Sequence, residues 1–314
     1  MIELFRAPNF DFIGKRRWAY LASAIVIGIG LISLIWHGGL EYDIDFAGGT
    51  LIQVRFDKRP AISAIRATLA KNQFRESVIQ EFGDAREFII RLPLTGTTSS
   101  EDVGRKVQAA LESDPSLGRV EVRRVEFVGP QVGRDLQIQA AYAVLAGLIG
   151  ILVYIAARFD LKGSVAAIAA VFHDVLVSIG MLSLTGREFS LPVLAALLTI
   201  IGYSVNDTIV AYDRLRENRG KVGATRGQSF AEQMNTAVNQ TLSRTVLTAL
   251  TVFFSTAILL FFGGKVLEDF AFTLFVGVIT GTYSTIYIAG ALVVEWTNWF
   301  ETGSRKGKKA VAKA

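Results

Sequence analysis

The sequence of 314 residues contains no cysteine. This excludes a disulfide framework, a catalytic thiolate and any metal site with thiolate ligands, and it leaves the redox compartment undetermined. Charged residues are also scarce over long stretches: 51% of all residues are hydrophobic, the mean hydropathy is +0.40, and the apolar residues form long blocks. This composition excludes a soluble enzyme with a large core and indicates a membrane protein.

The N-terminus also lacks a clear site for signal-peptide cleavage. Residues 1–17 are hydrophilic and end in three basic residues, and the apolar run from Trp18 to Trp36 contains no clear small-x-small cleavage pattern. This run is about as long as a bilayer requires, so we expect it to remain as the first membrane span.

The apolar blocks predict six membrane-spanning helices, because a crossing takes roughly 20 helical residues. The predicted spans are 18–36, 136–157, 164–185, 191–212, 245–262 and 269–294. A polar insertion at 37–135 separates the first two spans, and residues 136–294 hold the other five. An amphipathic segment at 226–241 either lies at the lipid interface or leads into the fifth span. A basic tail, 295–314, ends the sequence.

Basic residues indicate the orientation of these spans. They precede the first span, separate the second from the third, and follow the fourth and the last, whereas the opposite short loops hold only Arg187 and Lys265. By the positive-inside rule, both termini are cytoplasmic and residues 37–135 lie outside. Membrane orientation therefore explains the net charge of +5 without a nucleic-acid partner.

The insertion has the pattern of a small α+β domain. Alternation typical of strands occurs at 50–56, 77–82, 86–92 and 119–127, and helical spacing occurs at 60–72 and 99–111. The order β-α-β-β-α-β predicts a ferredoxin-like fold. The fold class is thus an α-helical membrane protein of six spans with an extracytoplasmic ferredoxin-like domain between the first two.

Single residues in the insertion give weaker signals. Ser99 and Asp102 fit a capping box for the second helix. Gly48-Gly49 marks the turn into the first strand. Asp43 and Asp45 alone are a weak indication of a metal site, because no further ligand lies near them in the sequence. No nucleophile, base and orienting group are apparent, so no enzymatic site is predicted.

Ionisable residues inside the apolar blocks are the candidates for function. His173-Asp174 falls near the middle of the third span, Asn206-Asp207 in the inner part of the fourth, and Arg244 at the cytoplasmic entry of the fifth. An ionised carboxylate in hydrocarbon costs about 3 to 10 kcal/mol and needs a partner, water or a proton, so Asp207 is the leading candidate.

Asp207 and Arg244 lie at similar predicted depth and could form an ion pair. Protonation of Asp207 would release Arg244 and change the preferred helix packing, which could convert a proton gradient into movement of the outer domain. Three plainer interpretations stay open. Arg244 could anchor its helix at the interface, Asp207 could be permanently paired, and His173-Asp174 could be a satisfied hydrogen-bonded pair instead of a proton relay.

Glycines in the spans predict close contacts between helices. Gly277 and Gly281 form a small-xxx-small pattern in the sixth span, and Gly202 lies in the fourth. Gly180 in the third span and the pair Gly147 and Gly150 in the second are further candidates for helix packing.

Several of these segments resemble one known family. They are FDFIGKR (10–16), DFAGGT (45–50), RFD (158–160), FHDV (172–175), IIGYSVNDTIVAYDRLREN (200–218) and SRT (243–245). Together they are similar to SecF-type members of the SecD/SecF family of protein-export membrane proteins, which belongs to the resistance-nodulation-division superfamily. The resemblance covers nearly the whole sequence, and the 200–218 segment is its most specific part.

The resemblance implies a function and partners. The chain would pair with SecD in a pseudo-symmetric set of twelve helices and associate with the SecYEG channel, with YajC as a further candidate partner. In a bacterial inner membrane, among its lipids, it would use the proton-motive force to promote preprotein translocation after the SecA steps driven by ATP. It would be a transport subunit, not an enzyme, and would need no cofactor.

The motifs also imply residue roles. Asp207 and Arg244 take the proton-coupling role, and His173, Asp174 and Asn206 are added as candidates because they lie beside or within the same motifs. Three rival functions stay open: a proton-coupled small-molecule exporter, an intramembrane aspartyl protease using Asp174 and Asp207, and a passive scaffold for the channel. The protease fits poorly, because Ser-Val-Asn-Asp replaces the Gly-x-Gly-Asp of that family.

Overall fold

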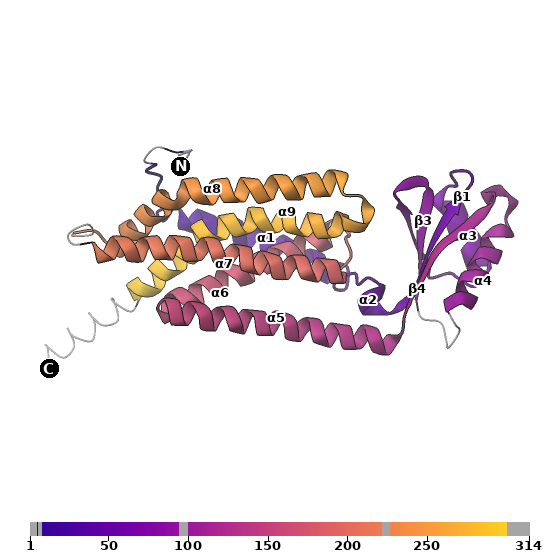
Figure 1. Cartoon of the computed structure of the whole chain (residues 1–314), viewed down its shortest axis with the longest axis horizontal. Helices are drawn as coiled ribbons and strands as arrows, with labels where there is room; N and C mark the ends of the chain where they lie inside the picture. Colours follow the sequence, from indigo (N-terminus) through magenta and orange to yellow (C-terminus); the bar gives the residue numbers. More distant parts are fainter. Residues whose placement is uncertain (1–4, 6–7, 94–99, 222–226, 300–314) are drawn as a thin grey trace.

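The computed structural model describes residues 5, 8–93, 100–221 and 227–299. Long helices form a bundle, and a small sheet domain projects from one end of it (Figure 1). The spanning helices are α1 (Arg16–Trp36), α5 (Pro130–Arg158), α6 (Leu161–Leu184), α7 (Leu191–Gly220), α8 (Phe230–Phe262) and α9 (Lys265–Ser284). A π-helical segment, η2 (Thr285–Ala289), continues α9, and helix follows as far as Trp299, the last described residue. The six predicted spans are confirmed by six helices long and apolar enough to cross a membrane.

The helices extend beyond the apolar blocks that predicted them. α5 begins at Pro130 instead of Leu136, and α7 continues past Tyr212 to Gly220. Residues 230–241 of the predicted amphipathic segment form the first turns of α8, so of the two alternatives this part of the segment leads into the fifth span. A capping box between Ser229 and Glu232 starts this helix.

The sheet domain contains β1 (Gly49–Phe56), α3 (Ile62–Lys71), β2 (Val78–Phe82), β3 (Asp84–Leu92), α4 (Ser100–Glu112), the short η1 (Pro115–Leu117) and β4 (Val120–Val128). Its strands are antiparallel in the order β2-β3-β1-β4, which is the arrangement that the β-α-β-β-α-β order predicts. The capping box expected at Ser99 lies outside the described residues.

The core of the sheet domain follows from the alternation along its strands. Ile52, Val54 and Phe56 of β1 point to one face of the sheet, where they meet Ile65 of α3 and Leu111 of α4. Successive strand residues point to opposite faces, so the other face carries more polar side chains and is turned away from the two helices.

The entry to β1 requires its two glycines. Gly48 and Gly49 have φ angles of +72° and +145°, which residues with a Cβ rarely adopt. A Cβ on Gly49 would also lie 2.6 Å from the carbonyl oxygen of Leu92. The turn predicted from Gly48-Gly49 is therefore present, and it follows α2 (Ile44–Ala47), a single turn between α1 and the sheet.

Polar contacts join the sheet domain to the bundle. Arg91 of β3 forms ion pairs with Glu188, in the α6–α7 connection, and with Asp43 before α2. The backbone N–H of Phe189 donates to the carbonyl of Glu41, and the N–H of Asp43 donates to the carbonyl of Phe189. The α6–α7 connection therefore holds the base of the sheet domain.

α6, α7 and α9 form the centre of the bundle, and α5 and α8 are its most exposed spanning helices. α1 packs on α6 at Gly30 and Gly180, where a Cβ on Gly30 would lie 2.8 Å from the Cα of Gly180. At the end of the bundle away from the sheet domain, the N–H of Phe10 donates to the Asn239 side chain of α8. The segment before α1 is thereby fixed to α8.

Candidate functional site

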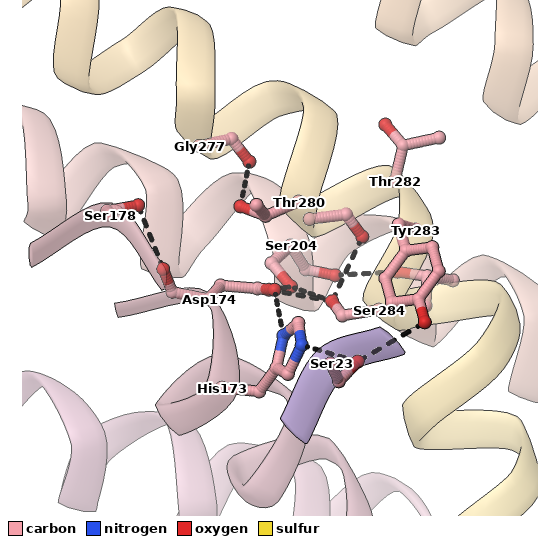
Figure 2. A network of polar contacts seen from close by, with 12 residues as sticks. Ser23, His173, Asp174, Ser178, Ser204, Gly277, Thr280, Thr282, Tyr283 and Ser284 are labelled. Atoms are coloured by element: carbon pink, nitrogen blue, oxygen red, sulfur yellow. Dashed lines mark hydrogen bonds and ion pairs between the residues drawn. The ribbon is translucent and has the colours of Figure 1, made fainter. Parts of the chain in front are cut away.

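A network of polar side chains lies inside the apolar bundle (Figure 2). Its centre is Asp174 of α6, which is fully buried. One carboxylate oxygen, Oδ1, lies 3.0 Å from Nδ1 of His173. The other, Oδ2, accepts hydrogen bonds from Ser204 of α7 at 2.6 Å and from Ser284 of α9 at 2.7 Å. Three helices thus meet at this carboxylate.

The network continues from His173 to α1. Nε2 of His173 lies 3.0 Å from the hydroxyl of Ser23. Ser23 donates to the Tyr283 hydroxyl at 3.2 Å, and Tyr283 donates to the carbonyl of Ala19 at 2.7 Å. Each hydroxyl has one proton to donate. Since the proton of Ser23 is directed to Tyr283, Ser23 accepts from His173, and His173 carries a proton on Nε2.

This assignment limits the state of the pair that His173 forms with Asp174. A hydrogen bond between Nδ1 and Oδ1 needs one proton, held by either atom. The pair is therefore either an imidazolium beside a carboxylate or an imidazole beside a carboxylic acid, and its net charge is zero in both states. A pair with zero net charge suits a buried site, because an unpaired buried charge is costly.

A second layer of hydroxyl groups lies one turn further along α7. The Thr208 hydroxyl lies 3.2 Å from that of Thr285, and both hydroxyls bond the carbonyl of Ser204. Thr285 is the first residue of η2. A π-helical turn inside an α-helix often marks a functional site. Here it begins directly after Ser284, which donates a hydrogen bond to Asp174.

Asp207 lies three residues after Ser204 and shares the buried side of α7 with it. Its exposed fraction is 3%, and its Oδ2 has no hydrogen-bond partner among the described residues. Buried polar atoms are nearly always hydrogen-bonded, so an orphaned carboxylate oxygen calls for an explanation. Asp174 has partners for both oxygens, and Asp207 does not.

Arg244 and Asn206 are exposed, whereas Asp207 is buried. Arg244, on α8, is exposed on the surface of the chain, and within the described ranges it forms no ion pair with Asp207 inside 4.0 Å, although its charge is close enough to act on that carboxylate. Asn206 points to the outside of α7. The structure thus brings His173 and Asp174 into contact but leaves Asp207 and Arg244 apart.

Three of the glycines predicted to pack helices, Gly202, Gly277 and Gly281, differ in their contacts. A Cβ on Gly277 would lie 2.1 Å from Cδ1 of Ile200, and one on Gly281 would lie 3.3 Å from Cβ of Ser204, so α9 approaches α7 closely at both positions. Gly202 makes no such contact: nothing lies within 4 Å of a Cβ placed there, and it is exposed. The expected contact at Gly202 is therefore absent within the described part of this chain.

Sequence reasoning missed the hydroxyl groups around the His173-Asp174 pair. The structure adds Ser23, Ser204, Tyr283 and Ser284 to the site. A usable signal was present, because hydroxyl residues recur beside these positions in the spans at 204, 208, 284 and 285. For the weak metal signal at Asp43 and Asp45, the described part of the chain holds no group of three potential ligands.

Comparison with protein families gives two matches. Residues 107–299 match the family described as protein export membrane protein SecD/SecF, C-terminal, and residues 38–58 match the SecD/SecF GG motif. The second match contains the turn at Gly48 and Gly49. The first contains every helix of the polar network except α1.

Individual relatives cover most of the chain. The protein translocase subunit SecF of Calditerrivibrio nitroreducens is 45% identical over 286 residues, which are 91% of this chain and 93% of that protein. The SecF of Pseudomonas aeruginosa is 39% identical, with 92% of each chain covered. A crystal structure of SecDF from Thermus thermophilus, described as a translocon-associated membrane protein, is 42% identical with a TM-score of 0.81. It covers 93% of this chain, which spans 39% of that longer one.

These matches agree with the fold and with the two-glycine turn. The chain belongs to the SecD/SecF family of protein-export membrane proteins.

Proposed function

We propose that this protein is a subunit of a bacterial protein translocase that couples the proton-motive force to preprotein translocation. It acts in the cytoplasmic membrane with both termini in the cytoplasm, together with SecD and the SecYEG channel, and with YajC as a further partner. It promotes late steps that need neither SecA nor ATP. The names of its relatives support the translocation role, and the relative that joins SecD and SecF in one name supports SecD as the partner.

The observation that carries the proton-coupling part is Asp207. An ionised carboxylate without a partner inside the membrane costs about 3 kcal/mol or more, so protonation or a conformational change that supplies a partner lowers the free energy. Buried ionisable groups of this kind mark proton pathways. The neighbouring His173-Asp174 pair holds a proton of its own and is joined to α7 through Ser204.

Arg244 supplies the second state. It lies on α8, outside ion-pair distance but close enough for its charge to act on Asp207. When Asp207 is protonated, the two side chains stay apart, and when the proton leaves, the charges attract and draw α8 towards α7. Alternation between these states moves α7 and α8 against each other once per proton cycle.

SecD is proposed to cover the outward face of α7. That face carries Ala195, Thr199, Gly202 and Asn206, which are exposed and spaced as one helical stripe. Small and weakly polar residues let helices approach closely in a membrane. Asn206 of the stripe precedes Asp207, whose side chain lies on the buried side of α7, so SecD would cover the helix face next to the one that carries the coupling carboxylate.

The test measures preprotein translocation into sealed inverted membrane vesicles, with and without a proton gradient, for the parent and Asp207→Asn at matched protein levels. We expect the gradient-dependent part to fall at least tenfold, because an amide cannot be deprotonated, and the ATP-driven part to remain. Glu217→Gln is the control, since Glu217 lies on the same helix but is exposed and paired with Arg214 and Lys221.

Unchanged gradient dependence in Asp207→Asn, with the complex assembled, would contradict the proposal and leave a passive scaffold as the better hypothesis. Normal translocation with altered efflux of small molecules would instead point to an exporter.

A further inference from the structure

A hollow in the surface lies far from the polar network, at the end of the bundle away from the sheet domain. It has a volume of about 520 Å³ and lies between the α5–α6 connection, the last turns of α7 and the start of α8. Aromatic side chains form its floor, among them Phe159, Tyr212 and Phe230. Basic side chains form its rim, namely Arg158, Arg216 and Arg219.

Two of the three basic side chains on the rim have no acidic partner among the described residues. Arg158 forms an ion pair with Asp213 at 2.9 Å. Arg216 donates to the carbonyl of Arg158, and Arg219 lies over the ring of Phe230 at 5.5 Å. Across the described ranges, no carboxylate lies within 4.0 Å of Arg216 or Arg219.

One acid also lines the hollow, and its charge offsets part of that of the three basic side chains. Asp160 directs its Oδ1 to the backbone N–H of Gly163 at 2.9 Å, where it caps the start of α6. Two guanidinium groups therefore face the hollow without an acidic partner. A guanidinium group presents a planar fork of donors that matches a phosphate, and two of them suit one phosphate group.

Phosphate chemistry alone does not explain the aromatic floor. Membrane orientation accounts for basic residues at this end, but it predicts scattered side chains in water and no apolar hollow beneath them. An anionic phospholipid has both required parts, a charged phosphate for the rim and an acyl chain for the floor. The volume lies within the range of about 300 to 1,000 Å³ that is usual for small-molecule sites.

We propose that this hollow binds one anionic phospholipid from the adjacent leaflet, with its phosphate at Arg216 and Arg219 and an acyl chain over Phe159 and Tyr212. The site joins five helices, and two of them, α7 and α8, carry Asp207 and Arg244. It goes beyond the proposed function, since a bound lipid is required neither by proton coupling nor by pairing with SecD.

The test uses the purified full chain in nanodiscs of phosphatidylcholine with a small fraction of phosphatidylglycerol, and native mass spectrometry counts the phosphatidylglycerol molecules retained. One basic residue near an anionic surface contributes roughly fivefold in affinity. We therefore expect Arg216→Gln with Arg219→Gln to weaken retention about 25-fold. If this double variant cannot be purified, Arg219→Gln alone is expected to weaken it about fivefold.

The control removes the same charge elsewhere. Lys15→Gln with Arg17→Gln takes two exposed basic residues from the same end of the bundle without touching the hollow. Equal losses in both double variants would overturn the site, because the attraction would then belong to the surface as a whole. Millimolar inorganic phosphate that displaces the lipid equally from parent and control would assign the hollow to soluble phosphates and overturn the lipid proposal.

Discussion

Asp174 and Asp207 are buried carboxylates on neighbouring helices, and their surroundings differ. Asp174 has His173 on one oxygen and two hydroxyl donors on the other. Asp207 has an oxygen without any partner among the described residues. The first environment keeps the net charge of the His173-Asp174 pair at zero, whereas the energy of the second changes strongly with protonation, which is why the proposal gives the switching role to Asp207.

Asp45 provides a test of pH dependence outside the membrane spans. Burial, followed by the nearby charge of Asp43, raises the pKa of its carboxyl above the usual value near 3.8. The folded chain then binds the proton more tightly than the unfolded chain, so local stability falls as pH rises from about 4 through the raised pKa and is constant above it. Hydrogen exchange of residues 43–49 over this pH range measures the slope.

Asp45→Asn should remove this slope, because the amide does not titrate. Asp43 lies in the same segment but forms an ion pair with Arg91, so Asp43→Asn is not a neutral control. Asp57→Asn, in the exposed turn after β1, serves instead. A slope that persists in Asp45→Asn would assign the titration to another group.

At the scale of elements, the contact of α9 with α7 depends on the missing side chain of Gly277. A Cβ there would lie 2.1 Å from Cδ1 of Ile200, so Gly277→Ala forces Ile200 or the helix to move. We expect a loss of about 1 to 3 kcal/mol, as is usual for overpacked cores. Thermal unfolding in detergent measures it.

Gly150→Ala is the matched control, because nothing lies within 4 Å of a Cβ at that position on α5. Alanine also favours helix over glycine by about 1 kcal/mol, so this variant should be neutral or slightly stabilised. Equal stability of the two variants would mean that α9 and α7 are less tightly packed than described.

Much of the element order was predictable, because it rests on local patterns. Apolar length predicted all six spans, and period-two alternation with turn residues predicted the order of the sheet domain. Helix ends were not predictable, since α5 and α7 continue into polar residues that apolar length does not detect. The π-helical turn at Thr285 also has no local signature.

The candidate site was predictable in part. Cost of burial singles out Asp174 and Asp207 from sequence alone. The partners of Asp174 depend on which helix faces meet. A hydroxyl such as that of Ser204 or Ser284 can equally well bond a carbonyl of its own helix. The outward position of Gly202 is also a tertiary property, because a glycine signals a close contact without saying with which chain.

At the scale of the whole molecule, the sheet domain is held to the bundle by Arg91. Burial lowers the pKa of this guanidinium, but arginine stays charged, and it pairs with Glu188 and Asp43. Glu188 lies in the connection between α6 and α7, the helices that carry Asp174 and Asp207. If these helices move, we expect this contact to carry the movement to the sheet domain.

Arg91→Gln should loosen this joint. The loss of a charge-assisted contact of about 1.5 kcal/mol should raise hydrogen exchange in residues 186–190 about tenfold. The translocation that depends on the proton gradient should fall while the ATP-driven part remains. Arg105→Gln, at an exposed ion pair within α4, should change neither. Faster exchange with full translocation would show that the joint is structural only.

The fixed N-terminal segment has a consequence for biogenesis. Phe10 is held by Asn239 of α8, and Arg16 pairs with Glu295 near the end of the last helix. These contacts cannot form on the ribosome until α8 and then the last helix have been synthesised. Until then, α1 lies in the lipid while the segment before it has no contact with α8 or the last helix. A nascent chain arrested before α8 should expose residues 8–14 to protease, and the complete chain should protect them.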